Sequence, residues 1–327
     1  MTPRKDLQQQ ETACGMTCPI CHLAQARQNF AKDSYPVYLC GNCRCEFLEP
    51  QPDDRKLEEI YSAHYFLGDH SEESDQRISE MKTATANLYL DRLAKAFPTK
   101  GARFLEIGCG TGDLLVQAQS RSLEVHGVEF STISAATANQ RLGAELVQPG
   151  TIENSSLPIG HFDVIAACDV IEHTRSPRSF LERAYALLRP GGLIFLVTPS
   201  LDSWSRKLLG KRWMDYKVEH LFYFGRTSLA RLLADTGFEQ PIFEGNRKVL
   251  TLDYVYHHFD RFTVPGLTPL FRLARRLAPE RLALRHWILP ASGIFVTARK
   301  PAVDTSKINR GGVASTGANS TPAKHGY

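Results

Sequence analysis

Between residues 103 and 198, short apolar runs alternate with longer amphipathic segments, and this alternation constrains the fold more than any other feature. Strands separated by helices build a parallel sheet with helices on both of its faces. We therefore expect an α/β fold with a doubly wound, mostly parallel sheet. Its strands are expected at 103–107, 124–129, 145–147, 162–167, 192–198 and 293–299, and its helices at 75–97, 113–120, 133–142, 177–188 and 228–236.

A glycine-rich loop follows the first of these strands. Gly108, Gly110 and Gly112 allow the backbone to turn tightly and to approach a ligand closely. Nicotinamide and flavin enzymes also use glycine-rich loops, but Glu106 stands just before this one. A pyrophosphate needs exposed amides without a neighbouring carboxylate, whereas a sulfonium ligand with an amino group tolerates one. The loop therefore favours a ligand other than a dinucleotide.

Four motifs in order resemble those of the class I S-adenosylmethionine-dependent methyltransferases. The segment from Leu105 to Gly112 resembles the signature loop of that family, and Glu129 ends the second strand where the family has a carboxylate. Residues 162–173 resemble the family's fourth-strand motif, and residues 187–192 resemble the turn before its fifth strand. The resemblance covers residues 75–300 and implies a seven-stranded Rossmann-like sheet.

The resemblance also implies a set of cofactor contacts. Glu106 is expected to face the charged methionine end of S-adenosylmethionine, Glu129 to bind its ribose, and Phe130 to lie against its adenine. Thr151 stands where the family more often has Asp, which leaves the adenine amino contact open, with Glu153 as an alternative partner. The complete expected set is Glu106, Gly108, Cys109, Gly110, Glu129, Phe130, Thr151, Ile152 and Asp169.

Two Cys-x-x-Cys pairs mark an N-terminal module. Cys18 and Cys21 are separated from Cys40 and Cys43 by a spacing typical of a zinc ribbon, and two such turns supply the four thiolates of a closed tetrahedral site. Zinc is preferred, and iron remains an alternative. A closed site has no open coordination position, so we do not expect this zinc to take part in methyl transfer. Three nearby residues are expected to be bystanders: Cys14, His22 and Cys45.

This module resembles zinc-ribbon headers of bacterial methyltransferases in glycan and natural-product pathways. Two roles are open for it. In the first, the module caps the active site or holds a substrate or a partner. In the second, it is a folding element that has no contact with the chemistry, because so small a unit depends on its metal for stability.

The candidate catalytic residues lie after the fourth and fifth strands. Asp169, Glu172 and His173 follow the fourth strand, and His220 lies in the loop after the fifth. Ligands of open α/β sheets bind at the carboxyl ends of the strands, so we expect these four side chains to converge there. The pattern resembles ubiquinone-biosynthesis O-methyltransferases and small-RNA 2′-O-methyltransferases, in which it binds a divalent metal. Mg²⁺ or another divalent ion is therefore one interpretation, and a histidine general base is the other.

The rest of the sequence indicates the domain boundaries and limits the classes of partner. We expect a disordered segment 1–13, a zinc-ribbon-like module 14–50, a linker or cap 51–74, a methyltransferase domain 75–300 and a disordered tail 301–327. The formal net charge of +4 is too small to require nucleic acid as a partner. No secretory signal or membrane-spanning run is evident, so a cytoplasmic location is expected.

Within residues 255–290, the segments 271–278 and 281–287 place leucines on one side and arginines on the other. This pattern is compatible with a lid helix, with peripheral contact to an anionic membrane, and with a phosphorylated, lipid-linked acceptor. The predicted function is O-methylation of a small or carrier-linked acceptor in glycan or secondary-metabolite biosynthesis. The alternatives are a sugar C-methyltransferase, an RNA methyltransferase, and a non-catalytic S-adenosylmethionine-binding partner subunit.

Overall fold

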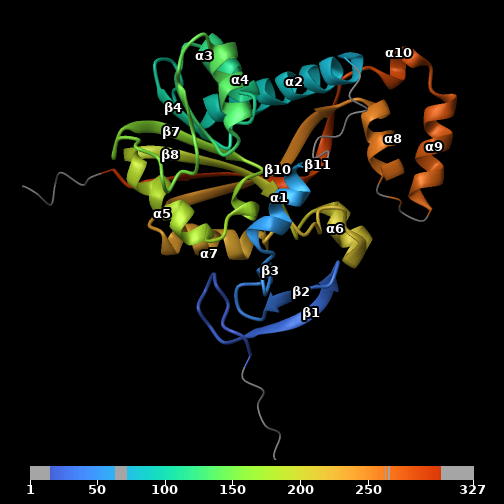
Figure 1. The fold of residues 1–327 in the computed structure, drawn as a ribbon, viewed down its shortest axis with the longest axis horizontal. Coiled ribbons are helices and arrows are strands. Elements are labelled where there is room, and N and C mark those ends of the chain that lie inside the picture. Colours follow the sequence, from blue (N-terminus) through green and yellow to red (C-terminus); the bar gives the residue numbers. More distant parts are fainter. Residues whose placement is uncertain (1–14, 63–71, 262, 264–265, 303–327) are drawn as a thin grey trace, which may run out of the picture.

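The computed structural model describes residues 15–62, 72–261, 263 and 266–302 (Figure 1). Several expectations therefore fall outside the described residues. These are the disordered segment 1–13, Cys14, the middle of the linker 51–74, and the tail beyond residue 302.

Seven strands form the main sheet, in the order β10-β11-β8-β7-β4-β5-β6. The five consecutive strands β8-β7-β4-β5-β6 are parallel to one another, and β11 is antiparallel to β8 and to β10. The predicted fold class is thus confirmed, while β10 was not expected. The strands are β4 Arg103–Ile107, β5 Glu124–Glu129, β6 Val147–Pro149, β7 Phe162–Cys168, β8 Leu188–Pro199, β10 Glu239–Leu250 and β11 Trp287–Arg299.

Helices cover both faces of this sheet (Figure 1). Successive side chains of a strand point to opposite faces, so Phe104 joins the apolar core on one side and Leu105 the core on the other. The first core is closed by α2 Glu72–Ala96, α3 Asp113–Ser120 and α4 Thr132–Leu142. The second core is closed by α5 Pro177–Leu187 and α7 Arg226–Asp235. Serine side chains cap the N-termini of α4 and α5.

The cysteine module forms a second, smaller sheet at one end of the molecule (Figure 1). Its strands are β1 Ala26–Lys32, β2 Tyr35–Cys40 and β3 Glu46–Leu48, and the fourth strand, β9 Phe222–Tyr223, comes from the part of the chain that carries the main sheet. Val37 and Phe47 belong to the same buried cluster as Leu196 and Leu229 of the main domain. The module therefore shares its core with the larger domain.

The shorter elements complete the structure. They are α1 Asp54–Ser62, the 3-10 turn η1 Ile171–His173, α6 Trp204–Leu209, the 3-10 turn η2 Gly210–Arg212, α8 Leu252–Arg261, α9 Leu267–Leu277 and α10 Glu280–Ala283. The α8 and α9 helices project together from the side of the main sheet (Figure 1). Among the described helices, none is long and apolar enough to cross a membrane.

Candidate active site

The glycine loop has the geometry that a close ligand requires. Gly108, Gly110 and Gly112 have φ values of 68°, 53° and 82°, in the left-handed region that favours glycine. A Cβ on Gly108 would lie 2.5 Å from Val170 Cγ2, so the turn after β7 lies directly against this loop. At Gly110 the position of a Cβ has no described heavy atom within 4 Å. The loop is thus packed on one side and open on the other.

Glu129 holds the two segments that border this open side. Its carboxylate accepts hydrogen bonds from the backbone N–H of Gly110 at 2.8 Å and of Ser131 at 2.9 Å. The next residue, Phe130, is 74% exposed, so a large aromatic face is available beside the carboxylate. The side chain of Ile152 is buried in the core, so this residue can meet a ligand only through its backbone, and Thr151 is half-buried.

Glu106 is a buried carboxyl group behind the same loop. It is 5% exposed, and its Oε2 has no hydrogen-bond partner among the described residues. Burial raises its pKa well above the usual value, and Asp113 and Glu129 add to the effect. A cation at the open side of the loop would relieve this cost. Cys109 is also buried, and burial raises the pKa of its thiol, so it is a packing residue.

Three of the four predicted catalytic residues come together. The rings of His173 and His220 pack edge to face, with centroids 4.7 Å apart. One oxygen or nitrogen from each of Glu172, His173 and His220 lies within 4.8 Å of the others. The 3-10 turn after β7 carries the first two residues, and the Leu221 N–H donates to the Glu172 carbonyl at 2.8 Å, which fixes His220 beside them.

The hydrogen bonds of the two rings define which nitrogen is basic. His173 Nδ1 lies 2.9 Å from the Glu219 carbonyl, and His220 Nδ1 lies 2.8 Å from the Asp215 carbonyl. A carbonyl can only accept, so both Nδ1 atoms carry the proton and Nε2 is the basic nitrogen of each ring. The basic Nε2 atoms of the two rings and the carboxyl group of Glu172 thus belong to one cluster.

Burial sets the protonation of this cluster. Desolvation lowers the pKa of His173 to about 4 and lowers that of His220 well below its usual value, so both rings are neutral at pH 7. Desolvation, with a contribution from Asp169, raises the pKa of Glu172 to about 8. Thr198 donates a hydrogen bond to Glu172 Oε2 at 2.9 Å, while Glu172 Oε1 has no hydrogen-bond partner among the described residues.

Asp169 lies outside this trio. It has a φ of 56°, and its carboxylate accepts from Lys248 Nζ at 2.7 Å. Lys248 comes from β10, an element that the sequence did not predict, and no motif around it signals a role. The structure thus adds a cation next to the residue that was expected to complete the catalytic group.

The cysteine site has the geometry of a tetrahedral metal centre. All four predicted sulfur atoms lie within 4.8 Å of one another, and the pairs Cys18–Cys43 and Cys21–Cys40 are each 3.6 Å apart. A disulfide would bring two sulfurs to about 2.05 Å, whereas thiolates around one zinc, with bonds of about 2.3 Å, lie roughly 3.8 Å apart. The nearby Cys45 thiol instead donates to the carbonyls of Glu46 and Tyr223.

The fold and the loop define the class of this domain. The strand order, with one antiparallel strand inserted beside β8, and the glycine turn after β4 are those of a Rossmann-like methyltransferase. Residues 79–240 match the family model that is described as a methyltransferase domain. This part of the chain belongs to the class I, S-adenosylmethionine-dependent methyltransferases.

The chain is similar to several ubiquinone biosynthesis O-methyltransferases. The protein from Parvibaculum lavamentivorans is 36% identical over 129 residues, which cover 37% of this chain and 50% of that protein. The protein from Caulobacter vibrioides is 35% identical over 121 residues, which cover 35% and 47%. The chain spans about half the length of these relatives. Geranyl diphosphate C-methyltransferase from Streptomyces coelicolor has a TM-score of 0.48 at 18% identity, covering 71% of this chain and 85% of that one.

Proposed function

We propose that the chain is an O-methyltransferase that acts on a small or carrier-linked acceptor in glycan or secondary-metabolite biosynthesis. The observation that carries this proposal is the pairing of two neutral imidazoles with a buried carboxyl group, next to the turn that packs on the glycine loop. A hydroxyl acceptor must lose its proton when the methyl group is transferred, and a neutral imidazole can take that proton. The names of the curated relatives agree with oxygen as the acceptor atom.

S-adenosylmethionine supplies an electrophilic methyl group when it is bound. We assign its methionine end to the loop around Gly108, Cys109 and Gly110, because a buried carboxyl group without a partner, Glu106, lies behind that loop. We assign the ribose hydroxyls to Glu129, whose carboxylate lies at the open side of the loop. We assign the adenine contacts to the exposed ring of Phe130 and to the segment at Thr151 and Ile152, and we assign Asp169 to the methyl end of the cofactor.

The role that we propose for the histidine pair is to hold the acceptor and to accept its proton. Nε2 of His173 or of His220 takes the hydroxyl proton, and the Glu219 and Asp215 carbonyls stabilise the resulting cation through the two Nδ1–H groups. Lys248 Nζ donates to the Asp169 carboxylate at 2.7 Å, and the cationic cofactor would lie on the other side of that carboxylate.

A divalent ion on the same trio is the second candidate mechanism. Two imidazole nitrogens and one carboxylate oxygen within 4.8 Å suit Zn²⁺ or Mn²⁺ better than Mg²⁺, which prefers oxygen ligands. A bound ion would lower the pKa of the acceptor hydroxyl directly. Both mechanisms use the histidine pair, and the ion mechanism also uses Glu172 as a ligand.

One experiment tests the proposed function and separates the mechanisms. The protein is incubated with S-adenosylmethionine and a panel of phenolic, sugar and carrier-linked hydroxyl acceptors, and S-adenosylhomocysteine is measured. Turnover is expected with a hydroxyl acceptor, and His220→Ala should reduce kcat by about 10²–10⁴-fold with unchanged cofactor affinity. Inhibition by a chelator that leaves the cysteine-bound metal in place would favour the ion, whereas an amine or carbon acceptor as the only substrate would contradict O-methylation.

For the four cysteines we propose a structural zinc ion. Cys18, Cys21, Cys40 and Cys43 supply a closed sulfur tetrahedron, and all four residues are buried. Because no coordination position remains, the ion would act on folding and on the neighbouring surface only.

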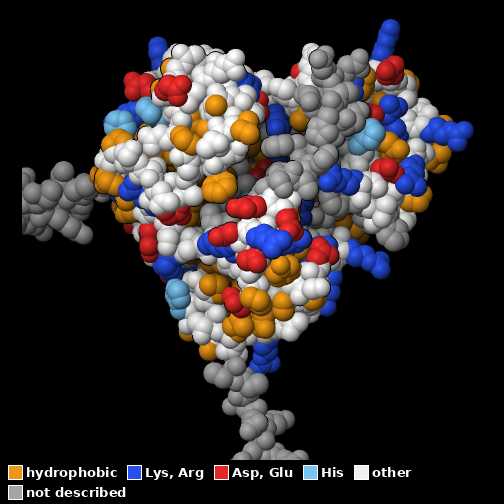
Figure 2. All heavy atoms as spheres, in the orientation of Figure 1, with side chains coloured by type: hydrophobic (Ala, Val, Ile, Leu, Met, Phe, Trp, Pro, Cys, Tyr) orange, Lys and Arg blue, Asp and Glu red, His pale blue; other side chains and the backbone are white. Residues whose placement is uncertain are grey.

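For the α9 helix we propose contact with an anionic membrane that presents a carrier-linked acceptor. Leu270, Leu273 and Leu277 are 58%, 54% and 73% exposed and recur at helical spacing on one side of α9. Arginines on and beyond the helix add positive charge, and Figure 2 shows Lys and Arg side chains among hydrophobic ones at this edge of the molecule. Exposed leucines flanked by arginines are typical of helices that lie on a membrane surface.

A further inference from the structure

The cysteine module is connected to the catalytic loop by continuous backbone pairing. β3 pairs with β9, through Glu46 opposite Tyr223 and Phe47 opposite Phe222. One residue before β9, the Leu221 carbonyl accepts from the Leu48 N–H at 3.0 Å. The Leu221 N–H in turn donates to the Glu172 carbonyl. A single residue, directly after His220, thus bonds the module on one side and the 3-10 turn of the active site on the other.

A buried polar bridge reinforces this connection. Glu46 of β3 is 3% exposed, and its Oε2 accepts from the Tyr216 hydroxyl at 2.5 Å. The same hydroxyl accepts from Arg206 Nε at 2.6 Å, and an Arg206 amino group lies 3.5 Å from Glu46 Oε1. A charge-assisted hydrogen bond in a buried site is stronger than one between neutral groups. The carboxylate of the module therefore restrains the segment that leads to His220.

Aromatic rings continue the path from this bridge to the histidine pair. Tyr216 packs edge to face on Tyr223 with centroids 4.9 Å apart, and Tyr223 lies 6.3 Å from His220. The Tyr223 hydroxyl donates to the Lys217 carbonyl at 2.7 Å. This hydrogen bond spans the chain segment that connects Tyr216 to Tyr223. Displacing Tyr216 would thus displace the ring against which His220 packs.

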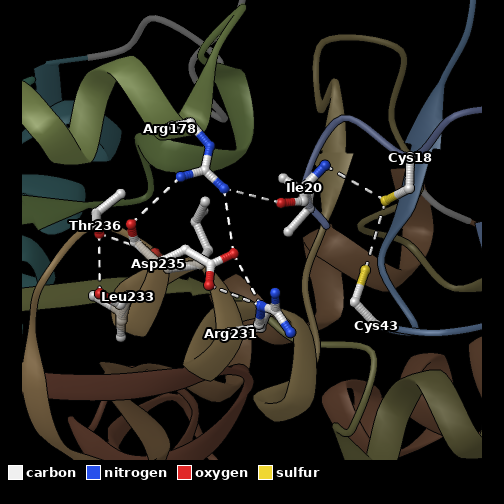
Figure 3. Close-up of polar contacts among 9 residues, drawn as sticks. Cys18, Ile20, Cys43, Arg178, Arg231, Leu233, Asp235 and Thr236 are labelled. Carbon is white, nitrogen blue, oxygen red and sulfur yellow. Dashed lines mark hydrogen bonds and ion pairs between the residues drawn. The ribbon is translucent and has the colours of Figure 1, made fainter. Parts of the chain in front are cut away.

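The other cysteine turn is bonded to α5, the helix that follows the catalytic turn (Figure 3). Arg178, at the start of α5, donates to the Ile20 carbonyl at 3.3 Å and forms an ion pair with Asp235 at 3.3 Å. Arg231 also pairs with Asp235, and its pKa is raised first by that carboxylate and further by Cys21 and Cys43. Arg178 thus joins the first cysteine turn to Asp235 of α7, which Arg231 also holds.

We propose that the cysteine module positions the catalytic histidine, and that Glu46 and Tyr216 are positioning residues for His220. The inference rests on the proposed function, because that function makes His220 part of the reaction. In this arrangement the metal orders the Cys40–Cys45 turn, and this turn fixes the position of β3. The strand β3, together with the side chain of Glu46, then holds residues 213–223 against η1. The module is then a component of the active site that touches no substrate.

Amide hydrogen exchange on the full-length, metal-loaded protein tests this inference without any need for turnover. The variants are Glu46→Gln and Tyr216→Phe, which keep the shape of each side chain and remove the charge or the hydroxyl. The matched control is Glu49→Gln, because Glu49 is an exposed carboxylate three residues further along the same segment. Exchange in peptides from 213–224 is expected to rise about ten- to a hundredfold in both variants, with no change in α4 and with the metal retained.

Kinetics provide the second measurement. With an acceptor that the wild type methylates, both variants should lose about ten- to a hundredfold in kcat, whereas the cofactor affinity and the Glu49→Gln control should stay at the wild-type value. Unchanged exchange in 213–224 in both variants would overturn the inference, and so would full kcat despite increased exchange. If the wild type methylates no acceptor, the proposed function fails, while the exchange result still decides whether the module restrains this segment.

Discussion

At the scale of single residues, the site combines ionisable groups whose buried environments disfavour their charged forms. Glu106 and Glu172 are buried carboxyl groups with raised pKa values, and each has an oxygen without a hydrogen-bond partner among the described residues. His173 and His220 are imidazoles that burial keeps neutral. Such shifts are costly for stability and concentrate at functional sites. Here Glu106 lies behind the glycine loop, and Glu172 and His173 lie in the turn that packs on that loop.

Replacement of Glu129 should weaken cofactor binding. A carboxylate that binds ribose hydroxyls contributes about 1.5–3 kcal/mol, so Glu129→Ala should lower S-adenosylmethionine affinity by roughly tenfold to a hundredfold. Isothermal titration calorimetry measures the effect, and circular dichroism checks that the fold is retained. Glu124→Ala, at the exposed beginning of the same strand, is the control. Wild-type affinity in the Glu129 variant would contradict the assignment of the ribose site.

At the scale of elements, a partly buried ion-pair group joins three strands at their amino ends. Asp163 of β7 accepts from the backbone N–H and the Nε of Arg103 in β4, both at 2.9 Å, and it also pairs with Arg189 of β8. Burial alone would raise the pKa of Asp163, but these hydrogen bonds outweigh it and hold the pKa at about 2, below the ordinary 3.8.

This shift predicts a specific loss of stability in acid. Because the folded pKa is depressed, the contribution is fully present above about pH 4 and is lost as the pH falls through about 2. The shift corresponds to roughly 2 kcal/mol. Urea unfolding of the wild type and of Asp163→Asn should show a stability difference that largely disappears between pH 5 and pH 2. A difference that is constant with pH would rule out the linkage.

The central strands and helices could be predicted from the sequence, because each has a complete local signal. The apolar run at 103–107 and the amphipathic pattern at 113–120 coincide with β4 and α3. By contrast β10 is exposed along its first half, so no alternation marks it as an edge strand. The partnership of β3 with β9 joins residues far apart in the chain, which local periodicity cannot reveal.

The same reasoning explains the outcome at the site. His173 and His220 could be expected together because β7 and β8 are adjacent and parallel, so the segments after them leave the same edge. The four cysteines could be grouped from their spacing alone. The roles of Lys248 and Tyr216 could not be predicted, because lysines in edge strands and tyrosines in loops are common. Their roles become visible only in the structure, where Lys248 contacts Asp169 and Tyr216 contacts Glu46.

At the scale of the whole molecule, the metal site should be needed for the small sheet and dispensable for the large one. Elemental analysis should find one zinc per chain, and Cys18→Ser or Cys40→Ser should release it while the seven-stranded sheet stays folded. Cys45→Ser is the matched control, because the Cys45 thiol bonds to carbonyls and lies outside the sulfur cluster. Purified protein without metal, in which every thiol reacts freely, would refute the zinc site.

Binding to membranes should depend on the leucines of α9. Leu273→Glu places a charge in the middle of the exposed apolar stripe and should abolish co-sedimentation with vesicles that contain anionic lipid, without affecting thermal stability. Zwitterionic vesicles and the substitution Leu282→Glu, on α10 outside the stripe, are the controls. Equal sedimentation of the wild type with both kinds of vesicle, or with neither, would exclude an electrostatic membrane contact.

The shared strand also orders events during synthesis. Cys45 and Tyr223 are 178 residues apart, so at ordinary translation rates the cysteine turns leave the ribosome roughly ten to forty seconds before β9 does. During that interval β3 presents an unpaired edge, the kind of surface through which nascent chains associate. Early metal capture would make the module compact but could not cover this edge. The small sheet, though it is made first, is finished only when most of the chain has emerged.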